Sequence, residues 1–148
     1  MKFFVINGPN LNLLGIREPD IYGSSSYEAL KKFISESGRE AGVETEIFQS
    51  NHEGEIVDII QSAMGKADGI VINPAAYTHT SIAILDALKA VNIPACEVHL
   101  SDTDAREEFR HVSYAGMACV KTFKGLGFNG YKEAIIYLKT YINELLIS

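Results

Sequence analysis

Short apolar runs alternate with longer amphipathic stretches along this chain. Residues 3–7, 43–49, Gly69–Asn73 and Ala95–His99 have the length and β-rich composition of strands, and 118–122 could form a weaker fifth strand. Gly69–Asn73 is apolar up to its last residue, which is typical of a central parallel strand covered on both faces. The pattern therefore predicts five strands.

Residues with helical spacing fill the intervals between these runs. In the first interval Leu30, Phe33 and Ile34 recur on one face, and Gly42 is placed to end the helix. Pro94 blocks helix continuation before the fourth strand. Four helices are expected. The first runs from 27 to about 41, the third from Thr80 or Ser81 to about Val91, and the last over 131–146. The second would be capped by Ser50 or Asn51, and its apolar face would hold Ile56, Ile59, Ile60 and Ala63.

Strands and helices thus alternate without a linker, repeat or low-complexity segment between them. This alternation predicts an α/β fold, a flavodoxin-like, doubly wound, five-stranded parallel sheet with helices on both faces, in a single domain spanning 1–148. In such a sheet, ligands bind beyond the carboxyl ends of the strands. Polar side chains cluster directly after the first, third and fourth strands: Asn7, Asn10 and Asn12; Asn73, Tyr77 and His79; Glu97, His99 and Ser101.

The composition favours a globular, cytoplasmic protein. Hydrophobic residues make up 47% of the chain, and no apolar run approaches the ~20 residues that span a membrane. The net charge of −6 and the lack of a basic cluster give nucleic-acid binding little electrostatic support. Cys96 and Cys119 stand in apolar stretches without the spacing of a metal knuckle or a redox pair, so we expect buried, reduced thiols.

Several common ligand-binding motifs are absent. The loop after the first strand has neither GxGxxG nor GxxxxGK[ST], no Ser/Thr-rich phosphate turn, and no acidic pair of the response-regulator kind. A GxSxG nucleophile elbow is missing as well. His79, Glu97 and His99 could converge on a metal ion, but amides and an arginine dominate the same edge, so a metal-free site is favoured.

The segment after the first strand, NGPNLNLLGIREPDIYG, is the most informative one. Gly15 and Gly23 flank its polar part, which suits a mobile lid at about 15–26. A tyrosine has an ordinary pKa near ~10, so Tyr22 could act as a base only beside a cation such as Arg17. From spacing alone, an ordinary surface loop is the simpler interpretation.

Two further clusters carry candidate binding and acid–base groups. Asn73 and His79 could hydrogen-bond a hydroxylated ligand, although a turn and a helix cap explain the same pattern. Strand alternation places Glu97 and His99 on one face, where the carboxylate can orient the imidazole as a general acid. A structural histidine at a strand end is the alternative. Asp86, inside the following helix, is by itself a solvated or interface carboxylate.

An anion could be held at the same edge. The backbone N–H groups of Leu100 and Ser101 could bind it if the chain turns helical there. Either Arg106 or Arg110 could reach the pocket as a carboxylate clamp or a hydroxyl donor, with surface ion pairing to Glu107 and Glu108 as the alternative.

Five segments, in order from residue 7 to residue 114, resemble type II 3-dehydroquinate dehydratases: NGPNLNLLGIREPDIYG, QSNHEGEIVD, GIVINPAAYTHTSIAILDAL, IPACEVHLS and REEFRHVSY. The closing GLGFNGY also fits. This family is flavodoxin-like, in agreement with the pattern above. The resemblance implies anti elimination of water from 3-dehydroquinate to 3-dehydroshikimate through an enolate, in the shikimate pathway, without metal, cofactor or Schiff-base lysine.

The resemblance also implies a role for each matching residue. Tyr22 would remove a C2 proton of the substrate, and Arg17 would lower the pKa of that phenol. Asn10 would help to hold, through a water, the enolate that develops at the C3 carbonyl. His99 would protonate the departing C1 hydroxyl, oriented by Glu97. The substrate-binding residues would be Asn73, His79, Asp86, Leu100, Ser101 and Arg110, with the Leu100 and Ser101 amides serving the carboxylate.

Assembly and two departures complete the comparison with the family. The family typically forms a dodecamer built from trimers, so we expect a homo-oligomer in which Asp86 acts across a trimer interface. Asp102 replaces a common Asn, and we expect its charge near the carboxylate site to weaken substrate binding. Residues 119–124 include Lys-Thr-Phe-Lys where small apolar residues are usual, which puts the last strand in question.

Two other classes of function compete with the enzyme. One is a non-catalytic flavodoxin-like module that binds a polyol acid or a partner protein. The other is a nucleotide or flavin carrier on the same fold. The presence of Tyr22, Arg17 and His99 together favours the enzyme, because a binding module needs no base, activating cation and acid.

Overall fold

The computed structural model describes residues 1–16 and 25–148, which form a five-stranded sheet flanked by helices. The strands run parallel in the order β2-β1-β3-β4-β5. This is the flavodoxin-like order, and it confirms the fold class predicted from the sequence. The strands are β1 Lys2–Asn7, β2 Glu44–Gln49, β3 Gly69–Asn73, β4 Ala95–His99 and β5 Lys121–Lys124.

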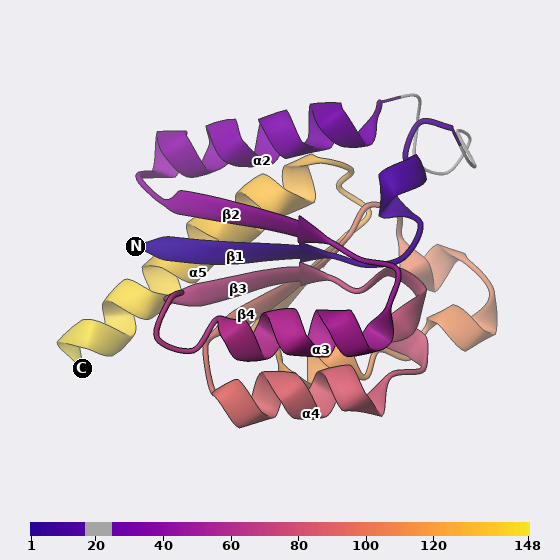
Figure 1. The fold of residues 1–148 in the computed structure, drawn as a ribbon. Coiled ribbons are helices and arrows are strands. Elements are labelled where there is room, and N and C mark those ends of the chain that lie inside the picture. Colours follow the sequence, from indigo (N-terminus) through magenta and orange to yellow (C-terminus); the bar gives the residue numbers. More distant parts are fainter. Residues whose placement is uncertain (17–24) are drawn as a thin grey trace.

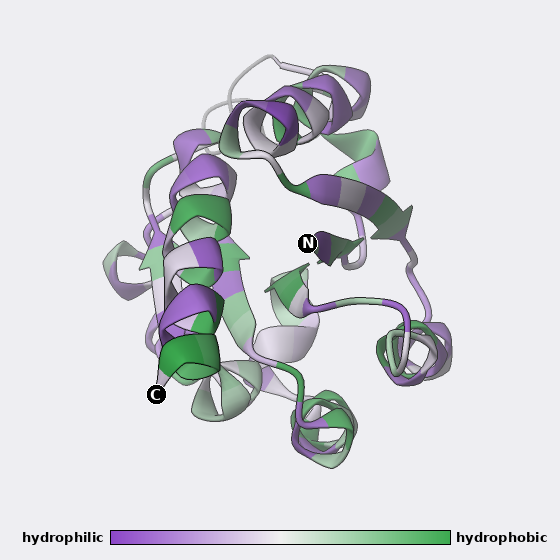
Figure 2. Ribbon diagram, turned by 90° about the vertical axis from the view of Figure 1, so that its left-hand side faces the viewer, coloured by the Kyte–Doolittle hydropathy of each residue, from purple (hydrophilic) through white to green (hydrophobic). Residues whose placement is uncertain are grey.

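Helices cover both faces of the sheet (Figure 1). On one face lie α2 (Tyr27–Ala41) and α5 (Asn129–Ile147), and on the other lie α3 (Glu53–Ser62) and α4 (Ile82–Val91). Figure 2 looks onto the edge where the strands begin and shows the sheet between the two helix layers. Short 3-10 turns complete the chain: η1 Leu11–Leu13, η2 Ala75–His79, η3 Thr103–Ala105, η4 Glu108–Arg110 and η5 Ala115–Ala118.

Each face of the sheet has its own apolar core. Phe3 and Val5 of β1 pack toward α2 and α5, whereas Phe4 and Ile6 pack toward α3 and α4. Strand geometry dictates this division, because successive side chains point to opposite faces. β3 lies at the centre of the sheet and is buried throughout, as its continuous apolar run predicted.

The predicted boundaries of α2 and α4 are confirmed. Ser26 Oγ accepts a hydrogen bond from the Ala29 N–H at 3.1 Å, and α2 ends at Gly42. Ser81, one of the two residues expected to start α4, accepts from the Ile84 N–H at 3.0 Å. Local signals were sufficient for both helices.

Two local predictions are wrong. Neither Ser50 nor Asn51 caps α3: its N-cap is His52, whose N–H donates to Ser50 Oγ at 3.0 Å. The last strand does not span 118–122 but begins at Lys121, because η5 occupies 115–118. The apolar side chains that suggested an earlier start pack against the two cores instead. A fifth parallel strand nevertheless forms from the divergent segment.

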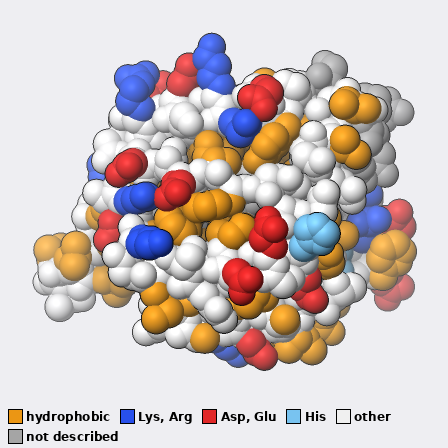
Figure 3. Space-filling model, in the orientation of Figure 1, with side chains coloured by type: hydrophobic (Ala, Val, Ile, Leu, Met, Phe, Trp, Pro, Cys, Tyr) orange, Lys and Arg blue, Asp and Glu red, His pale blue; other side chains and the backbone are white. Residues whose placement is uncertain are grey.

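The expectation of buried thiols holds for Cys96, whereas Cys119 is only partly buried. Cys96 and Cys119 are free, and burial raises the pKa of the Cys96 thiol to about 12. On the face seen in Figure 3, Lys and Arg side chains stand among Asp and Glu side chains. Within the two described ranges, no helix has the length and apolar character needed to cross a bilayer.

Candidate active site

A cavity of about 170 Å³ lies beyond the carboxyl ends of β1, β3 and β4, and we call it the site cavity. The sequence pattern predicted a ligand site at this edge of the sheet. Its described lining comes from three strand ends and from the segment between β4 and β5: Pro9, Asn10, Leu11, Asn73, Ala75, Ala76, His79, His99, Leu100, Ser101, Thr103, Arg106 and Arg110.

A close contact between the loops after β1 and β3 positions Asn10 at the wall of the cavity. The Gly8 N–H donates to the Asn73 carbonyl at 2.8 Å, and a Cβ on Gly8 would lie 2.5 Å from the Pro74 carbonyl oxygen. Only glycine fits there. Asn10 then adopts left-handed backbone with φ 71°, which asparagine tolerates better than most residues. Its N–H donates to Asn51 Oδ1 at 3.0 Å, which fixes the turn at the cavity wall.

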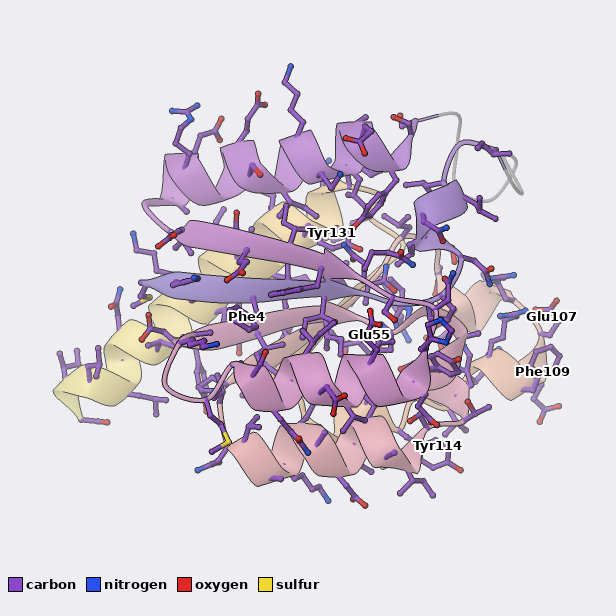
Figure 4. All side chains as sticks on the ribbon, viewed as in Figure 1. Phe4, Glu55, Glu107, Phe109, Tyr114 and Tyr131 are labelled. Atoms are coloured by element: carbon purple, nitrogen blue, oxygen red, sulfur yellow. The ribbon has the colours of Figure 1, made fainter. Side chains whose placement is uncertain are left out.

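Asn73 belongs to a buried neutral group, Asn7, Asn73 and Tyr131, that we call the Tyr131 cluster. Asn73 Nδ2 donates to the Tyr131 hydroxyl at 2.9 Å, and that hydroxyl donates to Asn7 Oδ1 at 2.7 Å. Asn73 Oδ1 accepts from the Ala75 N–H at 3.1 Å. Burial raises the pKa of Tyr131, so the phenol stays neutral. Figure 4 shows Tyr131 between α5 and the sheet. An amide nitrogen carries two hydrogens, so Asn73 has a second donor to offer a ligand.

His79 brings a neutral imidazole to the cavity. The Val112 carbonyl oxygen lies 2.6 Å from His79 Nδ1, and because a carbonyl can only accept, Nδ1 carries the proton. Burial lowers the pKa of His79, and the hydrogen bond to Val112 offsets part of that effect. The neutral ring therefore has Nε2 as an acceptor, which suits a ligand hydroxyl.

Glu97 and His99 of β4 form a buried acid–base pair. Their side chains meet on one face of the strand, as predicted, with Glu97 Oε2 at 2.9 Å from His99 Nε2. Burial by itself would raise the pKa of the carboxyl, but hydrogen bonds from His99, Ser113 and Thr78 hold that pKa at about 2. The carboxylate is thus ionised at neutral pH and accepts from Nε2–H. Nδ1 of His99 is left as the ring nitrogen that can exchange a proton with a ligand.

Leu100 and Ser101 line the cavity directly after β4. Their carbonyl oxygens accept hydrogen bonds from the N–H groups of Gly127 and Gly125, each at 3.1 Å, which fixes the orientation of both peptides. The chain does not turn helical at Leu100, since η3 begins at Thr103. Anion binding there would therefore rest on individual peptide N–H groups rather than on a helix terminus.

Arg110 fits both interpretations that the sequence allowed. It lines the site cavity, and its Nε donates to Glu107 Oε2 at 2.7 Å. Its guanidinium also lies 5.1 Å from the centre of the Phe109 ring. Figure 4 shows Glu107 and Phe109 at the outer edge of the molecule. Because a guanidinium has five N–H donors, the ion pair uses a part of its capacity and a carboxylate can bind the rest.

The described structure does not bring every predicted residue to the cavity. Asp86 stands on the exposed face of α4 and is not among the described lining residues. Arg17 and Tyr22 lie outside the described residues. Asp102 is exposed and accepts from the Asp104 N–H at 3.0 Å, so the structure gives it a capping role rather than a place in the described cavity wall.

The hydroxyl groups that surround Glu97 were not predicted from the sequence. Thr78, Ser113 and Thr122 each donate to its carboxylate. A glutamate inside a buried strand signals that donors must exist, because a buried charge without them is costly. That signal does not say which residues supply them, since the three come from different segments.

The cavity therefore combines proton exchange with polar binding. The imidazole of His99 can transfer a proton, Asn73 and His79 can bind hydroxyl groups, and Arg110 can bind a carboxylate. In residues 1–16 and 25–148, no three His, Cys, Asp or Glu side chains form a group that could hold a metal ion. A small hydroxylated acid matches these groups.

Comparison with known proteins points to one family. The family model for dehydroquinase class II matches residues 1–139. A 3-dehydroquinate dehydratase from Clostridium acetobutylicum is 54% identical over 144 residues, which cover 97% of this chain and 100% of that protein. Its counterpart from Caldicellulosiruptor bescii is 57% identical over 143 residues, covering 96% of this chain and 99% of the relative. The crystal structure of a type II dehydroquinase from Butyrivibrio crossotus superposes with a TM-score of 0.92 at 52% identity, covering 94% of this chain and 97% of the other. The chain belongs to the class II dehydroquinase family.

Proposed function

We propose that this chain is a 3-dehydroquinate dehydratase, a hydro-lyase that converts 3-dehydroquinate to 3-dehydroshikimate in the shikimate pathway. Membership of the family over most of the chain supports the reaction. The structural observation that carries the proposal is the Glu97–His99 pair, in which His99 lines the site cavity and Glu97 holds it from behind the wall. Loss of a hydroxyl group needs a proton donor beside it, and a carboxylate-supported histidine supplies one near neutral pH.

In this proposal, His99 is the general acid. Its Nδ1–H protonates the C1 hydroxyl, the C1–O bond breaks, and the oxygen leaves as water. The electrons of the enolate form the C1–C2 double bond, and the C3 carbonyl is restored. Glu97 holds Nε2 throughout and keeps Nδ1 directed at the ligand.

The base and the enolate contacts come from the segment after β1. Tyr22 would remove the C2 proton as a tyrosinate, with Arg17 favouring that anion, and 15–26 would form the lid. Asn10 would hold a water beside the enolate oxygen, where one well-placed donor is worth on the order of 3 kcal/mol. The place of Tyr22 and Arg17 in the family-like NGPNLNLLGIREPDIYG segment, and the position of Asn10 at the cavity wall, support these roles.

The other polar groups would bind substrate. The Asn73 amide and the neutral Nε2 of His79 suit ring hydroxyls, and the N–H groups of Leu100 and Ser101 suit the carboxylate. Arg110 would add a charged donor from the segment between β4 and β5.

We also propose a cytoplasmic homo-oligomer, a dodecamer of trimers in which Asp86 completes the site of a neighbouring subunit. Two features support an interface on this side of the molecule: Asp86 is exposed on α4, and Ile82 on the same helix is 55% exposed. Light scattering should give a mass near twelve times the 16.2 kDa of one chain, and a monomer with full activity would contradict the shared site.

The test of function is the ultraviolet absorbance of the conjugated enone product. Purified protein is mixed with 3-dehydroquinate, with and without a chelator, and again after borohydride treatment. We expect an absorbance rise that survives both treatments. No rise from a folded, assembled protein that still binds quinate-like acids would favour a binding module instead.

A further inference from the structure

Donors from separate segments enclose the carboxylate of Glu97. Its Oε2 accepts hydrogen bonds from Thr78 Oγ1 and from Ser113 Oγ, each at 2.5 Å, in addition to His99 Nε2 at 2.9 Å. Its Oε1 accepts from Thr122 Oγ1 at 2.9 Å. We call Thr78, Ser113 and Thr122 the hydroxyl cage. Glu97 itself is 1% exposed, so this cage takes the place of water.

The backbone is shaped to bring the cage this close. The Gly116 N–H donates to Ser113 Oγ at 2.9 Å, which directs the Ser113 proton toward Glu97. A Cβ on Gly116 would lie 2.7 Å from Glu97 Oε1 and 3.0 Å from Ser113 Oγ, so a larger residue would displace the carboxylate or the serine. Thr78 Oγ1 and Ser113 Oγ lie 2.6 Å apart, and each hydroxyl limits the movement of the other.

The cage also connects β4 to two segments beside the site cavity, η2 and the segment that contains Val112 and Ser113. Thr78 precedes His79 on η2, and Ser113 follows Val112, whose carbonyl fixes the tautomer of His79. The Tyr114 N–H donates to the Thr78 carbonyl at 2.7 Å. Glu97 is the point where these two segments meet the strand that carries the histidine.

A buried carboxylate stays ionised only if hydrogen bonds from its donors offset the hydration free energy that it loses on burial. If one hydroxyl is removed, the charged form loses a hydrogen bond and the pKa of Glu97 must rise. Once Glu97 is protonated, it is a weaker acceptor for His99 Nε2–H, and the imidazole loses its orientation. The hydroxyls thus affect the reaction through the carboxylate.

We propose that Thr78 and Ser113 are positioning residues that keep Glu97 ionised and aimed at His99, so that proton delivery to the leaving hydroxyl depends on them. Neither residue is in the described wall of the site cavity, so their effect does not require contact with substrate. This inference rests on the proposed dehydratase activity and extends it to residues outside the site cavity.

Other titratable groups surround Glu97 and must be considered in any test by pH. His99 and His79 lie on the side of the site cavity, and Cys119 lies before β5. His111 and Lys124 line a neighbouring cavity of about 290 Å³ that Glu97 also borders. Burial raises the pKa of the Cys119 thiol, which stays neutral. Among the described hydrogen bonds of Glu97, His99 is the titratable partner, so a change in the carboxylate is transmitted to that ring.

The first readout is the pH profile of turnover in Thr78→Val, Ser113→Ala and the double variant. Glu97 stays ionised at neutral pH in every variant, so any fall in kcat at that pH reports the lost orientation of the carboxylate toward His99. We expect kcat at neutral pH to fall about tenfold in each single variant and KM to change less than about twofold. The acidic limb of the kcat profile should move to higher pH by about 1 unit for each hydroxyl removed. Thr78→Ser, which keeps the hydroxyl, should restore both. Thr140→Val on the exposed face of α5 is the matched control and should resemble the wild type.

The second readout needs no turnover. The side-chain carboxyl carbon of Glu97, assigned with Glu97→Gln, is titrated by NMR in the free protein. We expect its midpoint to rise in Thr78→Val and Ser113→Ala. Unchanged midpoints and pH profiles in the folded variants would overturn the inference, even if kcat fell. A wild-type protein without turnover whose Glu97 midpoint still responds to the cage would overturn the proposed function and leave the effect of the hydroxyls on the carboxylate in place.

Discussion

Two clusters of buried polar side chains lie at the carboxyl edge of the sheet, and they differ in whether the buried groups are neutral or charged. The Tyr131 cluster satisfies two amides and a phenol with neutral hydrogen bonds. The pair of Glu97 and His99, with its hydroxyl cage, buries a charge and surrounds it with donors. Burial raises the pKa of Tyr131, whereas the donors hold the pKa of Glu97 at about 2. One cluster is a fixed support for the loops after β1 and β3, and the other can move a proton.

The largest effect should come from removing the proton donor in the charged cluster. In His99→Asn we expect kcat to fall by about 10²- to 10⁴-fold, because general-acid catalysis contributes that much. His52→Asn, at an exposed histidine before α3, is the matched control and should keep wild-type kcat. Steady-state kinetics gives kcat for both variants and for the wild type. A His99→Asn enzyme with wild-type kcat would remove the distinction between the two clusters.

The next effect concerns stability at low pH. The pKa of Glu97 is lowered from 4.5 to about 2 in the folded protein, so the unfolded chain binds this proton more readily. The stabilisation is fully present above about pH 4.5 and is lost as the pH falls through about 2. Between these two pH values, the free energy of unfolding of the wild type should change by on the order of 3 kcal/mol because of Glu97, and Glu97→Gln should lack this change.

Urea denaturation at several pH values measures this dependence. The slope of unfolding free energy against pH should be smaller in Glu97→Gln than in the wild type. Tyr131→Phe should keep the wild-type slope, because the phenol is neutral over the whole interval. Equal slopes in Glu97→Gln and wild type would mean that Glu97 is not the buried charge described here.

The neutral cluster should show its contribution in stability rather than in pH dependence. Tyr131→Phe leaves Asn7 Oδ1 and Asn73 Nδ2 without their buried partner, which should lower the free energy of unfolding by about 1–3 kcal/mol. We expect kcat to fall far less than in His99→Asn. Tyr137→Phe, on the same helix and 38% exposed, is the matched control. If the two phenylalanine variants were equally stable, the Tyr131 cluster would not support the edge.

The smallest effect should come from Asp102, which belongs to neither cluster. In Asp102→Asn the new side chain can accept the same capping hydrogen bond from Asp104, and the lost charge is exposed and screened. We therefore expect KM for 3-dehydroquinate to change less than about twofold. A large drop in KM would instead support the expectation from sequence that Asp102 weakens carboxylate binding.

Much of the fold could be predicted because its signals are local. The apolar run of Gly69–Asn73 identified a central strand, and the serine caps of α2 and α4 marked where those helices begin. The start of β5 could not be predicted in the same way. Residues before it are apolar, but Gly116 brings that segment against Glu97 as the turn η5, which is a tertiary contact.

The candidate site also contains residues that local patterns predicted and residues that only tertiary contacts bring together. Strand ends and alternation were enough to place Asn73, His79, Glu97 and His99 at one edge. The partners of Glu97 were not predictable, because Thr78, Ser113 and Thr122 lie 19, 16 and 25 residues away along the chain. Tyr131 and Asn7 are 124 residues apart, and no spacing rule connects them.

The central claim is that ionised Glu97 acts through His99 to release water from 3-dehydroquinate. The most direct measurement is the rate of enone absorbance at neutral pH for the wild type and for Glu97→Gln, with folding of both verified by circular dichroism. We predict turnover by the wild type and a loss on the order of 10²-fold in Glu97→Gln. Equal rates for the two folded proteins would contradict the account.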